Sequence, residues 1–236
     1  MGASDVRTPR ERYRAQVQEE IKERAWEQIA TAGASALSLN AIAKRMGMSG
    51  PALYRYFASR DELITELVRD AYRSLADAFR ARAAAGADVA GLAQALRRWA
   101  LDDPQRYLLV YGTPVPGYRA PEDTTRISVE IMAVLLDACA AERSLVEQPP
   151  VEQPPVEQPP AERSPAVPPS PFDAHLAEHR AWAGEHPAPP AVLHLALAVW
   201  TRLHGVLSLE LAGHFAGMGF DPAELYAAEL RSLTGR

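Results

Sequence analysis

The sequence predicts an all-α protein of about nine to ten helices. Alanine is abundant and β-branched residues are few outside short runs, which favours helix over sheet. Apolar residues recur at intervals of three and four along most of the chain, as on the buried face of an amphipathic helix. Capping residues, prolines in first turns and glycines after last turns divide these stretches into separate helices. Because 47% of the 236 residues are apolar, the chain can form a substantial core.

The N-terminal region is expected to begin with a polar, disordered tail over residues 1–8. The first helix is predicted over Pro9–Thr31, since proline suits a first helical turn and Gly33 ends the apolar pattern. The buried stripe of this helix recurs every four residues and consists of Val17, Ile21, Ala25 and Ile29.

The stretch from Ser38 to Phe57 predicts two short helices joined by a tight turn, which is a helix-turn-helix. Ser38 can cap the first helix, because its hydroxyl accepts from backbone N–H groups that lack a helical partner. Gly47 stands where the chain must reverse and a positive φ is needed.

The second of these helices, Gly50–Phe57, is small at its start and polar further along. Ser49 can cap this helix, and Leu53 and Phe57 are expected to face inward. The residues expected to point elsewhere are Tyr54, Arg55 and Tyr56. A slim first turn suits close approach to base edges in a major groove.

These residues resemble the DNA-binding unit of the TetR family of transcriptional regulators. The matching elements are Ile42-Ala-Lys-Arg-Met-Gly-Met-Ser, Ala52-Leu-Tyr-Arg-Tyr-Phe and Ser59-Arg-Asp-Glu-Leu63, in an ungapped match from about Val17 to Val68. The resemblance implies a homodimeric regulator of double-stranded DNA, most simply a repressor that a small-molecule effector releases. Two reading helices in successive major grooves predict a near-palindromic operator with half-sites about one or more helical turns apart.

The residues expected to contact DNA fall into groups by role. Phosphate contacts are expected from Ser49, Tyr54, Tyr56 and Arg60, and base contacts from Gly50, Pro51, Ala52 and Arg55. Ser38, Lys44 and Arg45 complete the predicted set. Arg55 is the one long donor in the base-facing group, and its guanidinium fits the O6 and N7 atoms of guanine.

The charge of the chain is unevenly distributed, although its net value is −5. Through Arg60 there are ten Lys and Arg against six Asp and Glu, which gives +4 and leaves −9 for the remainder. A basic end on an acidic body is typical of a protein that presents one end to DNA. Charges scattered along solvated helices would give the same pattern, so the charges alone leave both interpretations open.

A long helix capped by Asp61 or Ser59 is predicted to run to about Ala85 and to couple the reading helix to the rest of the chain. Its inward residues are expected to be Leu63, Leu67 and Leu75 or Phe79. The predicted domains are therefore residues 9–85, with the helix-turn-helix at 38–57, and residues 86–236, a ligand-responsive and dimerisation domain.

The remaining helices are predicted from capping and apolar spacing. They are Asp88–Leu101, Gln105–Tyr111, Pro121–Ala141, Phe172–Glu185, a long helix from Pro189 or Pro190 to Phe215, and a last helix capped by Asp221.

A proline-rich insert occupies residues 144–171. Val146-Glu-Gln-Pro-Pro is followed by two identical pentapeptides, and recurrent proline pairs exclude helix. Polyproline II or disorder is expected. Tandem expansion of a surface loop explains the repetition, and a docking site for a proline-binding module is the alternative.

Trp200, His204 and Gly205 resemble the C-terminal domain of a TetR subgroup named for its Trp-His-Gly pattern, as does Tyr111-Gly-Thr-Pro-Val-Pro-Gly. This resemblance implies an all-helical ligand-responsive or dimerisation domain. Gly205 inside a helix costs roughly 1 kcal/mol relative to alanine, which close approach of another helix would offset. We therefore expect a four-helix bundle between two copies of the chain. The residues expected at that interface are Trp200, Gly205, Leu209 and Leu225.

An apolar effector cavity is expected to be lined by an aromatic set. Its candidates are Trp99, Tyr107, Tyr111, Tyr118, Trp200 and His204. Ordinary core packing would explain the same residues, and His204 suits a satisfied core position equally well.

The sequence contains no phosphate-binding glycine loop, no Gly-x-Ser-x-Gly motif and no paired-carboxylate motif, so we expect neither an enzyme nor a cofactor. His175 and His179 have the spacing of two metal ligands, but without a zinc motif around them a solvated pair is favoured. The single cysteine, Cys139, fits a reducing compartment. The most apolar stretch, Ala191–Ala212, is interrupted by charged residues and predicts a buried helix in a soluble cytoplasmic protein, with no membrane partner.

Two other functions fit parts of the pattern. A DNA-organising structural protein without an effector would also need the helix-turn-helix. An enzyme built on the helical body would leave that motif vestigial, but no catalytic constellation supports it.

Overall fold

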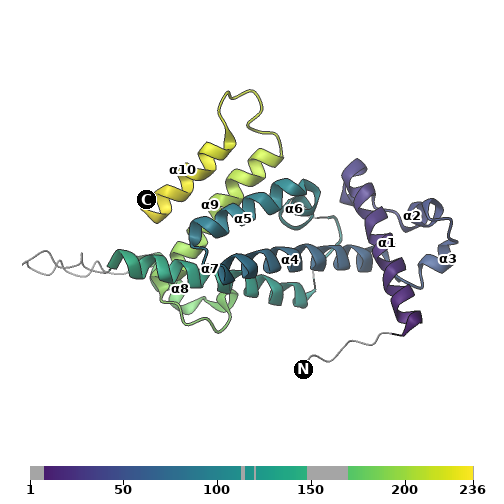
Figure 1. Cartoon of the computed structure of the whole chain (residues 1–236), viewed down its shortest axis with the longest axis horizontal. Helices are drawn as coiled ribbons and strands as arrows, with labels where there is room; N and C mark the ends of the chain where they lie inside the picture. The colour runs from purple at the N-terminus through teal and green to yellow at the C-terminus, as the bar shows by residue number, and fades with distance from the viewer. Residues whose placement is uncertain (1–7, 113–114, 120, 148–169, 236) are drawn as a thin grey trace, which may run out of the picture. The chain divides into compact units, whose positions relative to one another are not determined.

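A computed structural model describes residues 8–112, 115–119, 121–147 and 170–235 (Figure 1). Over these residues it contains ten α-helices, two short 3-10 helices and no β-strand, which confirms the predicted all-α class. The chain divides into two compact units. The first is Met1–Ser74 with Asp102–Thr125, and the second is Leu75–Leu101 with Arg126–Arg236.

The first unit combines the N-terminal helices with a later segment of the chain. Its helices are α1 (Pro9–Ala32), α2 (Leu39–Arg45), α3 (Gly50–Leu53), the first part of α4 (Arg60–Ala84), α6 (Pro104–Tyr111) and the start of α7 (Glu122–Glu147). Figure 1 shows α2 and α3 beside α1. A capping box begins α1, in which Thr8 accepts from the Glu11 backbone and the Glu11 carboxylate accepts from the Thr8 backbone.

A single apolar core holds this unit together. The predicted stripe of α1 is confirmed, since Val17, Ile21, Ala25 and Ile29 are all buried. Buried residues of α2, α3 and α4 join the same cluster, and so does Val115, which follows α6 in the chain. The segment after α6 therefore packs on the core of the helix-turn-helix itself.

The second unit is built around α9. Its helices are the later part of α4, α5 (Val89–Asp102), most of α7, α8 (Pro171–Glu178), α9 (Pro190–Leu211) and α10 (Pro222–Thr234). α9 packs against α8 and against α10. Two polar links hold the helices further: the Tyr226 hydroxyl donates to the Ala93 carbonyl at 2.7 Å, and Arg97 pairs with Glu210.

The end of α4 nearest α3 is capped by Ser59, the second of the two predicted caps. Its hydroxyl accepts from the Glu62 N–H at 3.0 Å. Asp103 and Asp221 cap α6 and α10 as predicted, by accepting from Arg106 N–H and Ala223 N–H at 3.0 and 2.8 Å.

Two predicted helix ends, those of α3 and α7, were placed wrongly. α3 ends at Leu53 instead of Phe57, because the chain tightens into a turn in which the Tyr56 N–H donates to the Leu53 carbonyl at 2.8 Å. α7 continues to Glu147 instead of ending at Ala141. Its end falls two residues before Pro149, since a residue that precedes proline disfavours the helical conformation.

Two further ends differ in the C-terminal half. α8 stops at Glu178, not Glu185, and the Arg180 guanidinium donates to carbonyl groups of the loop that follows, at 3.1 Å to Ala188. α9 stops at Leu211, not Phe215, and Gly213 adopts a φ of +77°. The predicted insert lies outside the described residues from residue 148 to residue 169, as does the predicted tail apart from Thr8.

Among the described helices, α9 is long and apolar enough to cross a membrane by length and composition, with a mean hydropathy of 1.4. It also carries charged residues that pair with other helices of its unit. Arg202 lies 3.4 Å from Glu229 of α10, and Glu210 pairs with Arg97 of α5. These pairs and its buried residues make α9 the central helix of the second unit.

We expect Tyr226→Phe to lower the free energy of unfolding by about 1 kcal/mol, because a buried hydroxyl–carbonyl hydrogen bond is lost. Tyr226 is only 3% exposed, whereas the control Tyr13→Phe changes a side chain that is 64% exposed. Urea unfolding followed by far-UV circular dichroism measures both changes. Equal midpoints for Tyr226→Phe and the unaltered protein would contradict the assigned hydrogen bond.

Candidate nucleic-acid interface

The turn between α2 and α3 has the predicted construction. The Ser38 hydroxyl accepts from the Ala41 N–H at 3.4 Å, which caps α2. Gly47 has a φ of +66°, and the following Met48 N–H donates to the Ala43 carbonyl at 2.9 Å. Only glycine adopts this left-handed conformation without a steric penalty, so Gly47 sets the direction in which the chain leaves α2.

α3 is a single turn whose position depends on its buried side chains. Leu53 is 0% exposed and Phe57 is 2% exposed, so both face inward as predicted. Ser49 takes the N-cap position, but its hydroxyl makes no capping hydrogen bond, contrary to expectation. Its side chain is exposed.

The outer face of α3, together with the turn that follows it, carries most of the residues predicted to contact bases and phosphates. Pro51, Tyr54 and Arg55 are exposed, whereas Gly50, Ala52 and Tyr56 are half-buried. A β-carbon added at Gly50 would lie 3.4 Å from the Asn40 side-chain oxygen, an ordinary contact. The first turn is therefore slim on its outer side, and Arg55 provides the long donor there.

Two predicted cations lie in the last turn of α2. The side chains of Lys44 and Arg45 are both exposed. Arg45 forms an ion pair with Glu27 of α1, with 2.7 Å between Nη2 and the carboxylate oxygen. An exposed pair of this kind is weak, so Arg45 can exchange its partner at little cost.

Arg60 lies at the start of α4 and is directed back into the protein. Its Nη2 donates to the carbonyl oxygens of Ala34 and Ser35, at 2.9 and 3.3 Å. Its side chain is 29% exposed and also lies 3.5 Å from Asp61. These contacts hold the loop between α1 and α2, which is a different use from the phosphate contact expected of it.

Arg14 is not in the predicted set of DNA contacts, yet it contacts the turn that follows α3. Its Nη2 donates to the Arg55 carbonyl oxygen at 3.0 Å, and its guanidinium lies 5.6 Å from the centre of the Tyr56 ring. The hydrogen bond joins residues 41 positions apart. Arginines at the start of the first helix are visible in the sequence, but nothing local identifies the one that reaches α3.

The aromatic residues proposed for an effector cavity are divided between the two units. Tyr107, Tyr111 and Tyr118 belong to the first unit, where the rings of Tyr107 and Tyr111 lie 5.3 Å apart. Trp99, Trp200 and His204 belong to the second.

In the second unit, the rings of Trp200 and His204 lie 4.2 Å apart on successive turns of α9. Trp99 is buried at 6% exposure. Burial lowers the pKa of His204 to about 4, so its imidazole is neutral near pH 7.

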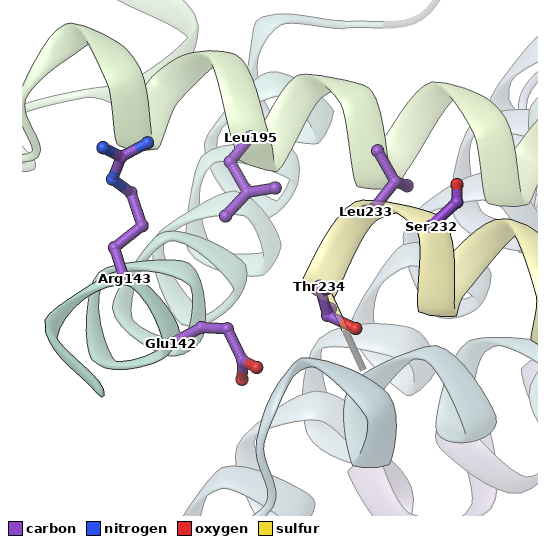
Figure 2. Close-up of a pocket in the computed structure, with 7 residues that line it drawn as sticks. Glu142, Arg143, Leu195, Ser232, Leu233 and Thr234 are labelled. Carbon is purple, nitrogen blue, oxygen red and sulfur yellow. The ribbon is translucent and has the colours of Figure 1, made fainter. Parts of the chain in front are cut away.

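A pocket of about 400 Å³ lies in the second unit, and none of the predicted ligand residues lines it. Figure 2 shows that its walls come from the end of α7, from α9 and from the end of α10. In that view Glu142 extends toward the end of α10, whereas the Arg143 guanidinium extends toward α9.

Of the four residues expected at a dimer interface, two face outward most clearly. Gly205 is exposed, and a β-carbon there would meet no atom of the described chain within 4 Å. Leu209 is 46% exposed. Trp200 and Leu225 are half-buried.

His175 of α8 stacks on His179, the residue that follows the helix. Their ring centres are 4.1 Å apart, and Phe172 stacks on His175. Within the part of the chain that the structure describes, no group of three His, Cys, Asp or Glu side chains is placed to hold a metal ion.

Comparisons with known proteins agree with this geometry. Residues 21–67 match the model of the bacterial regulatory proteins of the tetR family. Residues 89–233 match the model described as the tetracyclin repressor-like C-terminal domain. HTH-type transcriptional regulators of Mycobacterium tuberculosis and Mycobacterium bovis are 36% identical to this chain over 228 residues, which cover 93% of it and 92% of each relative.

Solved structures of other proteins share the fold of this chain. The crystal structure of SCO4313, described as a regulatory protein, is 65% identical, with a TM-score of 0.82, over 97% of this chain and 100% of that one. A TetR/AcrR family regulator from Thermobifida fusca shares the fold at a TM-score of 0.57 and 17% identity, over 93% of this chain and 97% of that one. The chain therefore belongs to the TetR family of bacterial transcriptional regulators, which bind DNA.

Proposed function

We propose that this regulator is a homodimeric repressor that binds a near-palindromic operator through α3 and leaves it when a small molecule binds. The observation that carries this proposal is the exposed outer face of α3 and of the turn after it, where Arg55 is exposed and Leu53 and Phe57 are buried. A dimer that occupies an operator blocks access to the DNA beneath it. The match of the C-terminal region to a tetracyclin repressor-like domain supports this direction of regulation.

In this proposal the residues at α3 have separate tasks. Arg55 reads a guanine, since a guanidinium can donate to both O6 and N7 in the major groove. Ser49, Tyr54, Lys44 and Arg45 contact phosphates and set the register on the duplex. Ser38, Arg60 and Arg14 act as positioning residues, because their side chains hold backbone groups of the protein.

The effector acts through α4, which begins beside α3 and carries the chain from the first unit into the second. A ligand shifts such a helix only if it binds two arrangements of the protein with different affinity. In a dimer, moving α4 changes the spacing between two reading helices and so their fit to successive grooves.

Dimerisation is proposed through α9 and α10. Internal packing gives no reason for glycine at position 205, because a β-carbon there meets nothing in the described chain. The neighbouring Leu209 exposes an apolar side chain. Close approach of a second copy would account for the glycine at position 205 and for the exposed Leu209. The pattern Trp200-x-x-x-His204-Gly205 would place the chain in the Trp-His-Gly subgroup. A regulator of this kind acts in the cytoplasm, where the DNA is.

Arg55→Ala is expected to relax base preference at one position in each half-site, at a cost of about 1–3 kcal/mol. Selection of bound DNA from a random pool measures this preference. Tyr54→Phe is the matched control and should weaken all sequences alike. An unchanged motif for Arg55→Ala would remove Arg55 from the base contacts, and the absence of any motif for the unaltered protein would favour the DNA-organising alternative.

Arg14→Ala is expected to weaken binding to the selected operator roughly tenfold without changing the motif, because it frees the end of α3. The slope of log affinity against log salt distinguishes positioning from phosphate contact. A positioning residue leaves the slope unchanged, whereas loss of a phosphate contact reduces it by about one. Arg14→Lys keeps the charge, so full activity of that variant would argue against the positioning role.

Gly205→Leu is expected to shift the dimer toward monomer, since a branched side chain blocks close helix approach. Light scattering measures the mass. The same substitution at an exposed position of α8, Ala177→Leu, should leave the mass unchanged. A Gly205→Leu protein that keeps the mass of a dimer would exclude this surface as the interface.

A further inference from the structure

A cavity of about 190 Å³ lies within the first unit, between α4, α6 and the segment that follows α6. Its α4 wall consists of Ile64, Val68 and Tyr72, which are four residues apart and so share one helical face. The rest of the lining includes Val110 of α6 and two residues of the segment that follows α6, Val115 and Tyr118. The cavity is thus built from two parts of the chain that pack together in one compact unit.

The apolar walls of this cavity are also part of the helix-turn-helix core. Ile64 is 0% exposed and Val68 is 4% exposed, and both belong to the cluster that buries Leu53 and Phe57. Val115 belongs to the same cluster at 8% exposure. A molecule in the cavity therefore touches side chains that hold α3 in place.

Tyr118, one of the residues that line the cavity, has a hydroxyl group without a partner over the described ranges. The Tyr118 hydroxyl oxygen is buried and has no hydrogen-bond partner among the described residues. Buried polar groups are nearly always hydrogen-bonded, because leaving one unpaired costs free energy. Burial, together with the nearby Tyr118, raises the pKa of Tyr72, so the neighbouring phenol remains protonated at neutral pH.

We propose that this cavity binds a small, mostly apolar molecule with one hydrogen-bond acceptor, which accepts from the Tyr118 hydroxyl. Every described residue that lines the cavity is uncharged, and burying an unpaired charge there would be expensive. An apolar cavity of about 150 Å³ holds benzene. A single ring with a short carbonyl or ether substituent therefore suits the available volume.

The effect of such a molecule on DNA rests on the proposed function. Because Ile64 and Val68 line the cavity and also pack in the core around Leu53, occupancy favours one arrangement of α4 beside α3. Binding of a molecule in the cavity requires neither a dimer nor an operator. The proposed binding site and the proposed release from DNA can therefore be disproved separately.

The test is calorimetric titration of the full chain with acetophenone and with α-methylstyrene. The two probes have nearly the same shape, but α-methylstyrene carries a CH₂ group where acetophenone carries the acceptor oxygen. We expect saturable binding of both, with acetophenone roughly three- to tenfold tighter, as one neutral hydrogen bond provides.

Three variants locate the site. Tyr118→Phe should remove the preference for acetophenone and leave α-methylstyrene binding unchanged. Tyr72→Phe is the matched control and should keep that preference. Val110→Phe should abolish binding of both probes by filling the cavity, with retained far-UV circular dichroism as the check on folding.

The inference is overturned if neither probe binds saturably, if Tyr118→Phe leaves the acetophenone preference intact, or if a folded Val110→Phe protein binds both probes normally. Operator binding is measured in parallel by fluorescence anisotropy. Probe binding that leaves operator affinity unchanged supports the site and counts against effector release. Operator release by other molecules without probe binding supports effector release and overturns the site.

Discussion

The burial of Leu53 and Phe57 against α4 is the constraint on which the position of α3 depends. α3 has only four residues, and a helix of this length has no stability of its own. Its backbone is fixed because Leu53 and Phe57 are buried in a cluster that includes Leu63 and Leu67 of α4. With the inner face anchored in this way, the outer face can carry small and polar residues without any loss of order. The outer surface of α3 is therefore positioned by the core beneath it.

This arrangement gives α4 two neighbours within the first unit. One face packs in the core of the helix-turn-helix, and the residues Ile64 and Val68 also meet the segment that follows α6. Packed interiors respond to added volume by shifting whole elements, because they have few voids and little compressibility. In the proposed mechanism, a ligand on the α6 side of α4 therefore alters α3 without touching it.

Several positively charged side chains of the N-terminal region form contacts within the protein that the sequence does not indicate. Several arginines of this region contact the protein itself: Arg14 donates to the Arg55 carbonyl, Arg45 pairs with Glu27, and Arg60 donates to the carbonyls of Ala34 and Ser35. Lys22 lies 2.6 Å from Asp70 of α4. These contacts assign the arginines to holding the loop after α1, the end of α2 and the turn after α3 in place.

The sequence by itself determined the features that depend on near neighbours in the chain. The Ser38 cap, the Gly47 turn, the four-residue stripe of α1 and the inward pair Leu53 and Phe57 all follow from local backbone geometry and helical period, and all are present. Tertiary structure decided the rest. It ended α3 early, turned Arg60 inward, brought Arg14 to α3, and divided the aromatic set between two units by packing residues 102–125 with the N-terminal helices. The reason is physical: helical period fixes which face of a helix is apolar, but the partner of that face is chosen by packing between segments far apart in the sequence, which no local pattern records.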